Sequence, residues 1–196
     1  MEQLAHELIE FIVWIDEITM EVLVEHRGPG LTKLMTSVTG LGSAAASVVF
    51  LILFHLADWR EEAVVTAVAV AITGVVVGAL MATIARPFPA EPVCITESSE
   101  SVATSFPSGH AAVVCAYAAM SRDSEHLPFV LVASLATLVS VSRVYLGTHY
   151  LSDTVAGIVI GIVAYLIAKG VVKRYDDLEP VTRYLDRDAD TDPMWR

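Results

Sequence analysis

Positive charge is scarce in this chain of 196 residues. It has 12 lysine and arginine residues against 23 aspartate and glutamate residues, a formal net charge of −11 at pH 7, and only three of the cations are lysines. A protein that binds nucleic acid needs clustered cations to neutralise the phosphate backbone. We therefore exclude nucleic acid as a partner, and any phosphate binding has to be local.

Charged residues and cysteines are few as well. Charged residues make up 18% of the chain and hydrophobic residues 55%, with a mean hydropathy of +0.60, which indicates an integral membrane protein. Cys94 and Cys115 lack the spacing of a zinc site or a redox pair, and we predict that both are unpaired. Glu2, Glu7 and Glu10 stand where a cleavable signal peptide would be positive, so we expect the first membrane span to direct insertion.

Long apolar runs predict an all-α helical bundle with about five transmembrane helices. A run of about 20 residues is long enough to cross the hydrocarbon core. A shorter apolar stretch follows Pro107 and ends near Met120, and we expect its start to lie below the membrane surface. The four longer runs cover roughly residues 34–56, 63–85, 127–147 and 152–172.

The two ends of the chain differ from this transmembrane domain, which we place at residues 31–172. Residues 1–30 contain an apolar helical stripe with glutamates largely opposite, which predicts an amphipathic helix in the membrane interface. Residues 173–196 are rich in aspartate, and we predict a solvated, poorly ordered tail. Pairs of small residues in two of the runs predict close helix packing, at Gly74 and Gly78 and at Gly157 and Gly161.

Unusual polar residues gather at the ends of these runs. If the helices alternate in direction, all of these ends emerge on one side of the membrane, and a charged residue at a single span end could by itself be an interfacial anchor. We expect the convergent set to form a site. Its members are Arg86, Pro87, Pro107 to His110, Ser142, Arg143, His149 and Asp153.

The segment from Ser105 to His110 predicts a helix start with Pro107 in the first turn. The backbone N–H groups of Ser108, Gly109 and His110 would then face outward. A helix N-terminus binds phosphate through such unpaired donors, and Gly109 would let an oxyanion approach the backbone closely. The alternative is an ordinary capped helix with a solvated histidine.

His149 and Asp153 are four residues apart, which would place both on one face of a helix beginning after Gly147. The carboxylate could then hold one imidazole nitrogen and leave the other unprotonated, as a nucleophile or base. The alternative is an aspartate that merely complements the helix dipole.

These residues carry a resemblance to a known family. Pro107-Ser108-Gly109-His110, and Ser142-Arg143 followed by His149 and Asp153, resemble the second and third signature motifs of the type-2 phosphatidic acid phosphatase superfamily. Arg86-Pro87 resembles the end of its first motif. The resemblance covers roughly residues 30 to 172, and the superfamily also includes vanadium haloperoxidases and glucose-6-phosphatase.

The resemblance implies a role for each matching residue. His149 would attack phosphorus and form a phosphohistidine, and Asp153 would orient it. His110 would protonate the leaving oxygen and then activate water. The mechanism implied needs neither a metal ion nor a cofactor. The phosphate oxygens would be bound by Arg86, Ser108, Gly109, Ser142 and Arg143.

One position departs from the family pattern. The first motif begins with a lysine seven residues before the arginine, and here that position is Ala79. Either a catalytic cation has been lost, or the site has adapted to its substrate. Lys33, expected near the same membrane side, is the lysine that might replace it.

The resemblance implies a membrane-embedded phosphatase for a lipid phosphate such as phosphatidate, phosphatidylglycerol phosphate or a polyprenyl (di)phosphate. Its partners would be this substrate and the surrounding membrane lipids. A phosphotransferase using the same histidine is an alternative, and so is a non-catalytic lipid-phosphate-binding member. Arg60, Arg122, Lys173 and Arg174 lie opposite the motifs, so we expect a cell-membrane protein with the site facing outward.

Overall fold

The computed structural model describes residues 2–90, 92–93 and 104–190, and their side chains through residue 175. These residues form helices and no strand, as predicted for an all-α protein. The elements are α1 (Glu2–Glu25), α2 (Pro29–Thr39), the 3-10 helix η1 (Gly40–Gly42), α3 (Ala44–Leu56), α4 (Arg60–Thr83), α5 (Gly109–Ser121), α6 (Phe129–Tyr145) and α7 (Leu151–Asp190).

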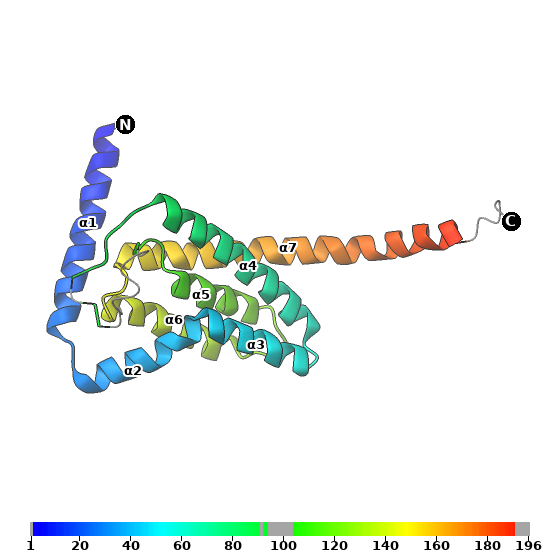
Figure 1. Ribbon diagram of the computed structural model, residues 1–196, viewed down its shortest axis with the longest axis horizontal. Coiled ribbons are helices and arrows are strands. Elements are labelled where there is room, and N and C mark those ends of the chain that lie inside the picture. The colour runs from blue at the N-terminus through cyan, green and yellow to red at the C-terminus, as the bar shows by residue number, and fades with distance from the viewer. Residues whose placement is uncertain (1, 91, 94–103, 191–196) are drawn as a thin grey trace.

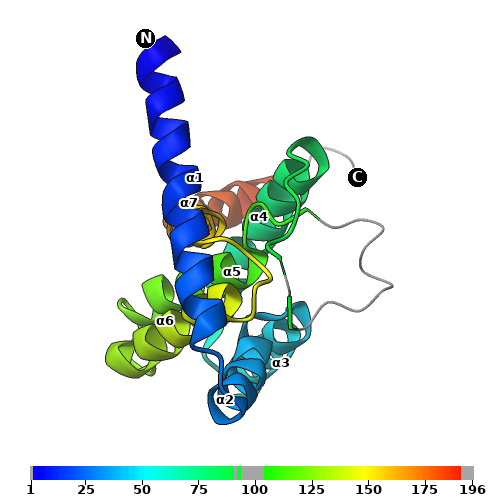
Figure 2. The ribbon, with the colours of Figure 1, turned by 90° about the vertical axis from the view of Figure 1, so that its left-hand side faces the viewer.

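Helix α5 forms the centre of the bundle. It contacts α4, α6 and α7, and its small side chains, including Ala111, Ala112 and Ala116, are buried. Helices α3, α4, α6 and α7 run alongside it, whereas α1 stands across one end of the bundle, where it touches α6 and α7 (Figures 1 and 2). A helix that lies in the membrane interface would have this orientation relative to helices that cross the membrane.

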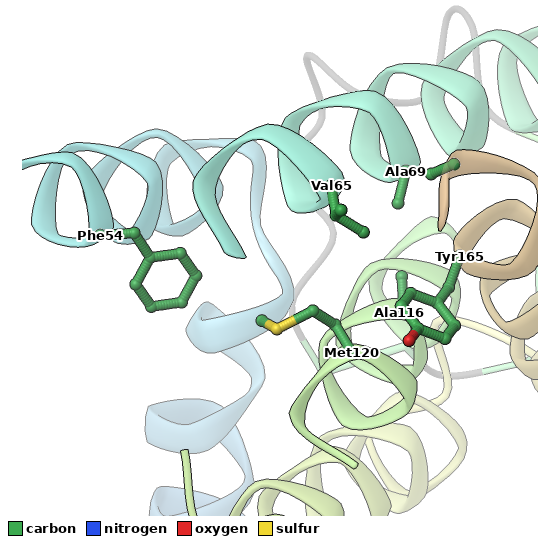
Figure 3. Close-up of a cluster of buried hydrophobic side chains, with 7 residues drawn as sticks. Phe54, Val65, Ala69, Ala116, Met120 and Tyr165 are labelled. Atoms are coloured by element: carbon green, nitrogen blue, oxygen red, sulfur yellow. The ribbon is translucent and has the colours of Figure 1, made fainter. Parts of the chain in front are cut away.

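The main hydrophobic core lies away from α1, between α3, α4, α5 and α7. Phe54, Val65, Met120 and Tyr165 point toward one another from these four helices (Figure 3), and each is at most 8% exposed. Burial of this apolar surface holds together the helix ends that lie away from α1. The polar residues gather at the opposite ends of the helices, near α1.

Two glycines bring α7 against α5. A Cβ atom at Gly157 would lie 2.3 Å from the Ser108 carbonyl oxygen, and one at Gly161 would lie 2.0 Å from that of Ala112. Only glycine fits at these contacts, so the predicted close packing of this pair is confirmed. The prediction for Gly74 and Gly78 is wrong, because a Cβ atom there would meet nothing within 4 Å.

The membrane-crossing segments agree only in part with the predicted runs. Helix α4 and residues 151–175 of α7 are long and apolar enough to span, and an 18-residue stretch within each has a mean hydropathy of 2.5 and 2.3, respectively. The run 34–56 is not one straight helix: α2 with η1 and α3 meet at an angle of 58°. The break falls at Gly40–Gly42, after which the Ser43 hydroxyl caps α3 by accepting from the Ala46 N–H. Helices α5 and α6 are shorter.

Both ends of the described chain are helical. Helix α1 covers Glu2–Glu25, within the region predicted as an amphipathic helix. Helix α7 continues past residue 172 to Asp190, so residues 173–190 of the predicted tail are helical, and residues 191–196 lie outside the described residues. Of the two cysteines, Cys115 is free, and Cys94 lies outside the described residues.

The contact between α5 and α7 leads to a stability prediction. Gly161→Ala should destabilise the fold by about 1–3 kcal/mol, because the added methyl group must push the two helices apart. Gly74→Ala is the matched control and should not lower stability, because its methyl group meets nothing within 4 Å and alanine favours a helix more than glycine does. Apparent Tm values in detergent, followed by circular dichroism, check this. Equal Tm values for the two variants would contradict the tight contact.

Candidate active site

A cavity of about 490 Å³ opens between α3, α4 and α5 at the end of the bundle nearest α1. Apolar side chains of α4 and α5 line one part of it. The predicted convergence is observed in part: the start of α5, the end of α6 and the loop before α7 meet at this cavity, whereas Arg86 and Asp153 do not line it. Its polar side chains are Ser47, Thr73, Thr104, His110, Arg143, Thr148 and His149, and Gly109 contributes backbone.

The loop that carries His149 is tied to the end of α6. Gly147 has a φ of 70°, a left-handed conformation that glycine adopts without strain, and it turns the chain back toward α6. The Arg143 carbonyl then accepts hydrogen bonds from the backbone N–H groups of Thr148, at 3.2 Å, and of His149, at 3.3 Å. Arg143 and His149 consequently share one rigid turn.

The His149 imidazole is buried, with 5% of the residue exposed. Its Nδ1 hydrogen-bonds the Ser105 carbonyl oxygen, and because that oxygen can only accept, Nδ1 carries the hydrogen and Nε2 has the lone pair. Burial, and then the positive charge of Arg143, lower the pKa of His149 to about 3. The imidazole is therefore neutral at pH 7, as a nucleophile requires.

Asp153 does not hold His149, and the predicted helical pairing is wrong. Helix α7 begins at Leu151, so His149 lies in the loop and not on the same helical face. The Asp153 carboxylate accepts instead from Arg86 Nη1 and from the Tyr150 N–H, the latter at 2.9 Å. Its carbonyl oxygen accepts from the Ser108 N–H at 3.0 Å.

Helix α5 starts at Gly109, so Pro107 is not in its first turn as predicted. Ser108 is the N-cap residue, and its hydroxyl accepts from the Ala111 N–H at 3.4 Å. Ser108 is fully buried and its own N–H bonds Asp153, so that donor does not face the cavity. Gly109 and His110 do line the cavity.

Of the two predicted phosphate ligands at the end of α6, Arg143 lines the cavity and Ser142 does not. Arg143 lines the cavity, and its Nη1 donates to the Thr39 hydroxyl at 2.9 Å, which positions the guanidinium. Ser142 is fully buried outside the cavity lining, and its hydroxyl donates to the Val139 carbonyl at 2.6 Å. Ser142 is therefore a packing residue of α6 in this conformation and not a phosphate ligand.

Arg86 lies beyond the end of α4 and outside the cavity lining. Its Nη2 donates to Asp16 at 2.7 Å, its Nη1 to Asp153 and to the Ser152 hydroxyl, and its guanidinium lies 4.1 Å from the centre of the Tyr150 ring. Burial would lower the pKa of Arg86, but the hydrogen bonds and charges of the two carboxylates raise it. In this conformation Arg86 binds carboxylates, which differs from the predicted contact with phosphate.

Asp16 is the residue of this region that the sequence interpretation missed. It is 1% exposed, whereas the glutamates of α1 are exposed. A signal was present, because Asp16 comes four residues after Ile12 and follows Ile15, on the apolar stripe of the helix. A carboxylate on a face that becomes buried needs a partner.

Neither Ala79 nor Lys33 belongs to the cavity. On α4 the cavity is lined by Val70, Thr73, Gly74, Val77 and Met81, and Ala79 is exposed on another face. Although Ala79 precedes Arg86 by seven residues, about two helical turns, the two do not share a helix face, because α4 ends at Thr83. Lys33 is exposed on α2, so the idea that it replaces a lost cation in the site is not supported.

Among the residues that the structure describes, no three His, Cys, Asp or Glu side chains are grouped so that they could hold a metal ion. The cavity instead brings together a buried neutral histidine, a second histidine, an arginine and the N-terminus of α5. In a bundle of apolar helices, this combination defines a membrane protein that acts on phosphate groups.

Comparison with known proteins gives the family. The model of the PAP2 superfamily matches residues 62–176, more than half of the chain, and the protein is a membrane phosphatase belonging to this superfamily. The chain is 27% identical over 180 residues to phosphatidylglycerophosphatase B of Bacillus subtilis (strain 168), covering 82% of this chain and 86% of that protein.

Solved structures agree with this assignment. A crystal structure described as the first transmembrane PAP2 type phosphatidylglycerolphosphate phosphatase, from Bacillus subtilis, matches with a TM-score of 0.70 and 25% identity, covering 81% of this chain and 85% of that one. Aquifex aeolicus LpxE matches with a TM-score of 0.64 and 24% identity, covering 77% and 92%, and shows the shared fold.

The outward position of Ala79 leads to a prediction about the missing motif lysine. Ala79→Lys should leave kcat/KM within about twofold of the wild type, because the new ammonium group points away from the cavity. Lys33→Ala should also leave kcat/KM within about twofold of the wild type. A gained contact to the transition state would instead raise kcat/KM about tenfold, or 1.4 kcal/mol. Phosphate-release kinetics of both variants distinguish these results, and a tenfold rise would contradict the geometry.

Proposed function

We propose that the protein hydrolyses the phosphoester of a lipid phosphate through a phosphohistidine at His149, without a metal ion. The observation that supports this best is the state of His149. The imidazole is buried and neutral, with Nδ1–H held by the Ser105 carbonyl and Nε2 left as the nucleophile. It lines one cavity with His110 and Arg143, the groups that this reaction needs beside it.

The reaction proceeds in two displacements. Burial, and then the charge of Arg143, lower the pKa of His110 to about 4, and the negative phosphate of a bound substrate raises it again and favours the protonated form. His149 Nε2 forms a bond to phosphorus while the bond to the lipid oxygen breaks, and protonated His110 gives its proton to that oxygen. Neutral His110 then takes a proton from water, whose oxygen attacks the phosphorus. The bond between phosphorus and Nε2 breaks, which releases inorganic phosphate and returns both histidines to their starting states.

Charge on the phosphoryl oxygens is stabilised by Arg143 and by the N-terminus of α5 at Gly109, both of which line the cavity. A Cβ atom at Gly109 would have Val77 at 3.5 Å as its nearest neighbour, so the backbone there is open to an approaching oxygen. Arg86 and Asp153 act outside this cluster, as supports of the loop that carries His149.

A lipid substrate fits the surroundings of the site. Val70, Val77, Met81 and Val113 line the apolar part of the cavity, and the histidines and Arg143 line the polar part. An acyl or prenyl chain would occupy the former and its phosphate the latter. The Bacillus subtilis relative is named for phosphatidylglycerophosphate, and we propose the same broad class, which includes phosphatidate and polyprenyl (di)phosphates.

The histidine roles predict different failures for two variants. His149→Gln should lower turnover of a lipid monophosphate by at least about 10³-fold and form no phosphoenzyme. His110→Gln should turn over slowly, because it lacks the group that protonates the leaving oxygen and activates water. His126→Gln is the control, since His126 stacks on Trp59 outside the cavity lining. Phosphate release and acid-labile ³²P labelling measure both steps.

Two results would contradict this proposal. Full activity of His149→Gln would exclude His149 as the nucleophile. Loss of activity after treatment with a chelator, restored by magnesium, would exclude the metal-independent mechanism. A wild-type protein that binds lipid phosphate and releases none would instead be the non-catalytic member considered above.

We also propose that the site faces away from the cytoplasm, because Arg60, Arg122, Lys173 and Arg174 lie toward the opposite end of the bundle. The Val93 N–H bonds the Leu146 carbonyl at 2.9 Å, so the chain next to Cys94 is attached at the site end. In a Cys115→Ala background, a membrane-impermeant thiol reagent should therefore label Cys94 in intact cells. Labelling that requires permeabilised cells would reverse the orientation.

A further inference from the structure

Helix α1 lies outside the matched family region, residues 62–176, yet one of its side chains reaches the support of the active site. Asp16 is the one acidic side chain of α1 that is buried, and both of its oxygens are bonded. Its Oδ1 accepts from the Ser152 N–H at 2.9 Å, and its Oδ2 accepts from Arg86 Nη2 at 2.7 Å and from the Ser152 hydroxyl.

The hydrogen bonds made by Asp16 lead through Arg86 and Asp153 to Tyr150 and Ser108, which lie one residue after His149 and two residues before His110. Arg86 and the Ser152 hydroxyl are joined to each other at 2.7 Å, and Arg86 also pairs with the fully buried Asp153. Asp153 then accepts from the N–H of Tyr150, which follows His149. Its carbonyl accepts from the N–H of Ser108, the cap of the helix that presents His110.

The charges of Asp16, Arg86 and Asp153 restrain one another. Two carboxylates share one guanidinium, and the Asp16 and Asp153 side chains are 2% and 0% exposed. A buried carboxylate that loses its partner is strongly disfavoured, so Asp16 and Asp153 hold Arg86 in one position and it holds them. The Tyr150 ring packs on the guanidinium, which also restrains the residue next to His149.

From these contacts, we propose that Asp16 is a positioning residue for phosphoryl transfer: through Arg86, Ser152 and Asp153 it fixes the loop of His149 and the cap of α5. This inference rests on the proposed phosphatase function. Helix α1 would then support catalysis by holding Arg86, in addition to any contact with the membrane surface. Displacement of reacting groups by about 1 Å can lower a rate about 10²-fold, so a support of this kind affects kcat.

The test is Asp16→Asn in the full-length enzyme, assayed with a dispersed lipid monophosphate. The neutral amide keeps the size of the side chain but cannot satisfy Arg86 and both Ser152 donors together. We expect kcat to fall at least about tenfold with KM within about twofold, and the phosphoenzyme to form correspondingly more slowly. Glu21→Gln removes the same charge from an exposed position of α1 and should retain wild-type kcat.

A second variant covers the case in which Asp16→Asn does not fold. Ser152→Ala removes the hydroxyl between Asp16 and Arg86 while its N–H still bonds Asp16, and it should lower kcat in the same way. Apparent Tm and the active fraction, titrated with vanadate as a phosphate analogue, separate lost rate from lost protein. Asp16→Glu, which keeps the charge, should recover part of kcat.

Unchanged kcat in both variants, or a fall fully explained by unfolded protein, would overturn the role of Asp16. An increase in kcat/KM would overturn it as well, since Asp16 would then be restraining Arg86 from binding phosphate. These outcomes require an active wild type, whereas failure of the proposed function would appear as a wild type that releases no phosphate.

Discussion

The close approach of α7 to α5 is the contact on which the polar end of the bundle depends. Gly157 and Gly161 remove the side chains that would keep the helices apart, and backbone therefore meets backbone. At that distance the Asp153 carbonyl reaches the Ser108 N–H, and the His149 ring reaches the Ser105 carbonyl. His149 and the start of α5 are thus set relative to one another largely by main-chain atoms, which tolerate little movement.

Buried charge is the second constraint. The region between α1 and the start of α7 buries Asp16, Asp153 and most of the Arg86 side chain, and each of these charges would be costly without the others. The reactive cavity next to it contains neutral His149 with Arg143. The paired charges around Arg86 are therefore separated from the histidines and arginine that line the cavity, which allows the charges around Arg86 to pair with one another.

Several features of the site followed from local patterns. The order and spacing of the motif residues predicted that His110, Arg143 and His149 would meet, and the cavity contains all three. The prediction for Asp153 failed because four-residue spacing describes neighbours only inside a helix, and α7 begins after His149. Helical periodicity also cannot place Ala79 and Arg86 on one face, because α4 ends before Arg86.

By itself, the sequence determined a membrane-embedded helical bundle and the residue types that line its cavity, because hydropathy and motif order are local properties of the chain. Only the tertiary structure decided which polar atoms pair. Asp16 and Arg86 are 70 residues apart, and no periodic pattern relates them. Their pairing depends on α1 crossing the end of the bundle, where burial removes Asp16 from water and makes Arg86 its partner (Figure 2).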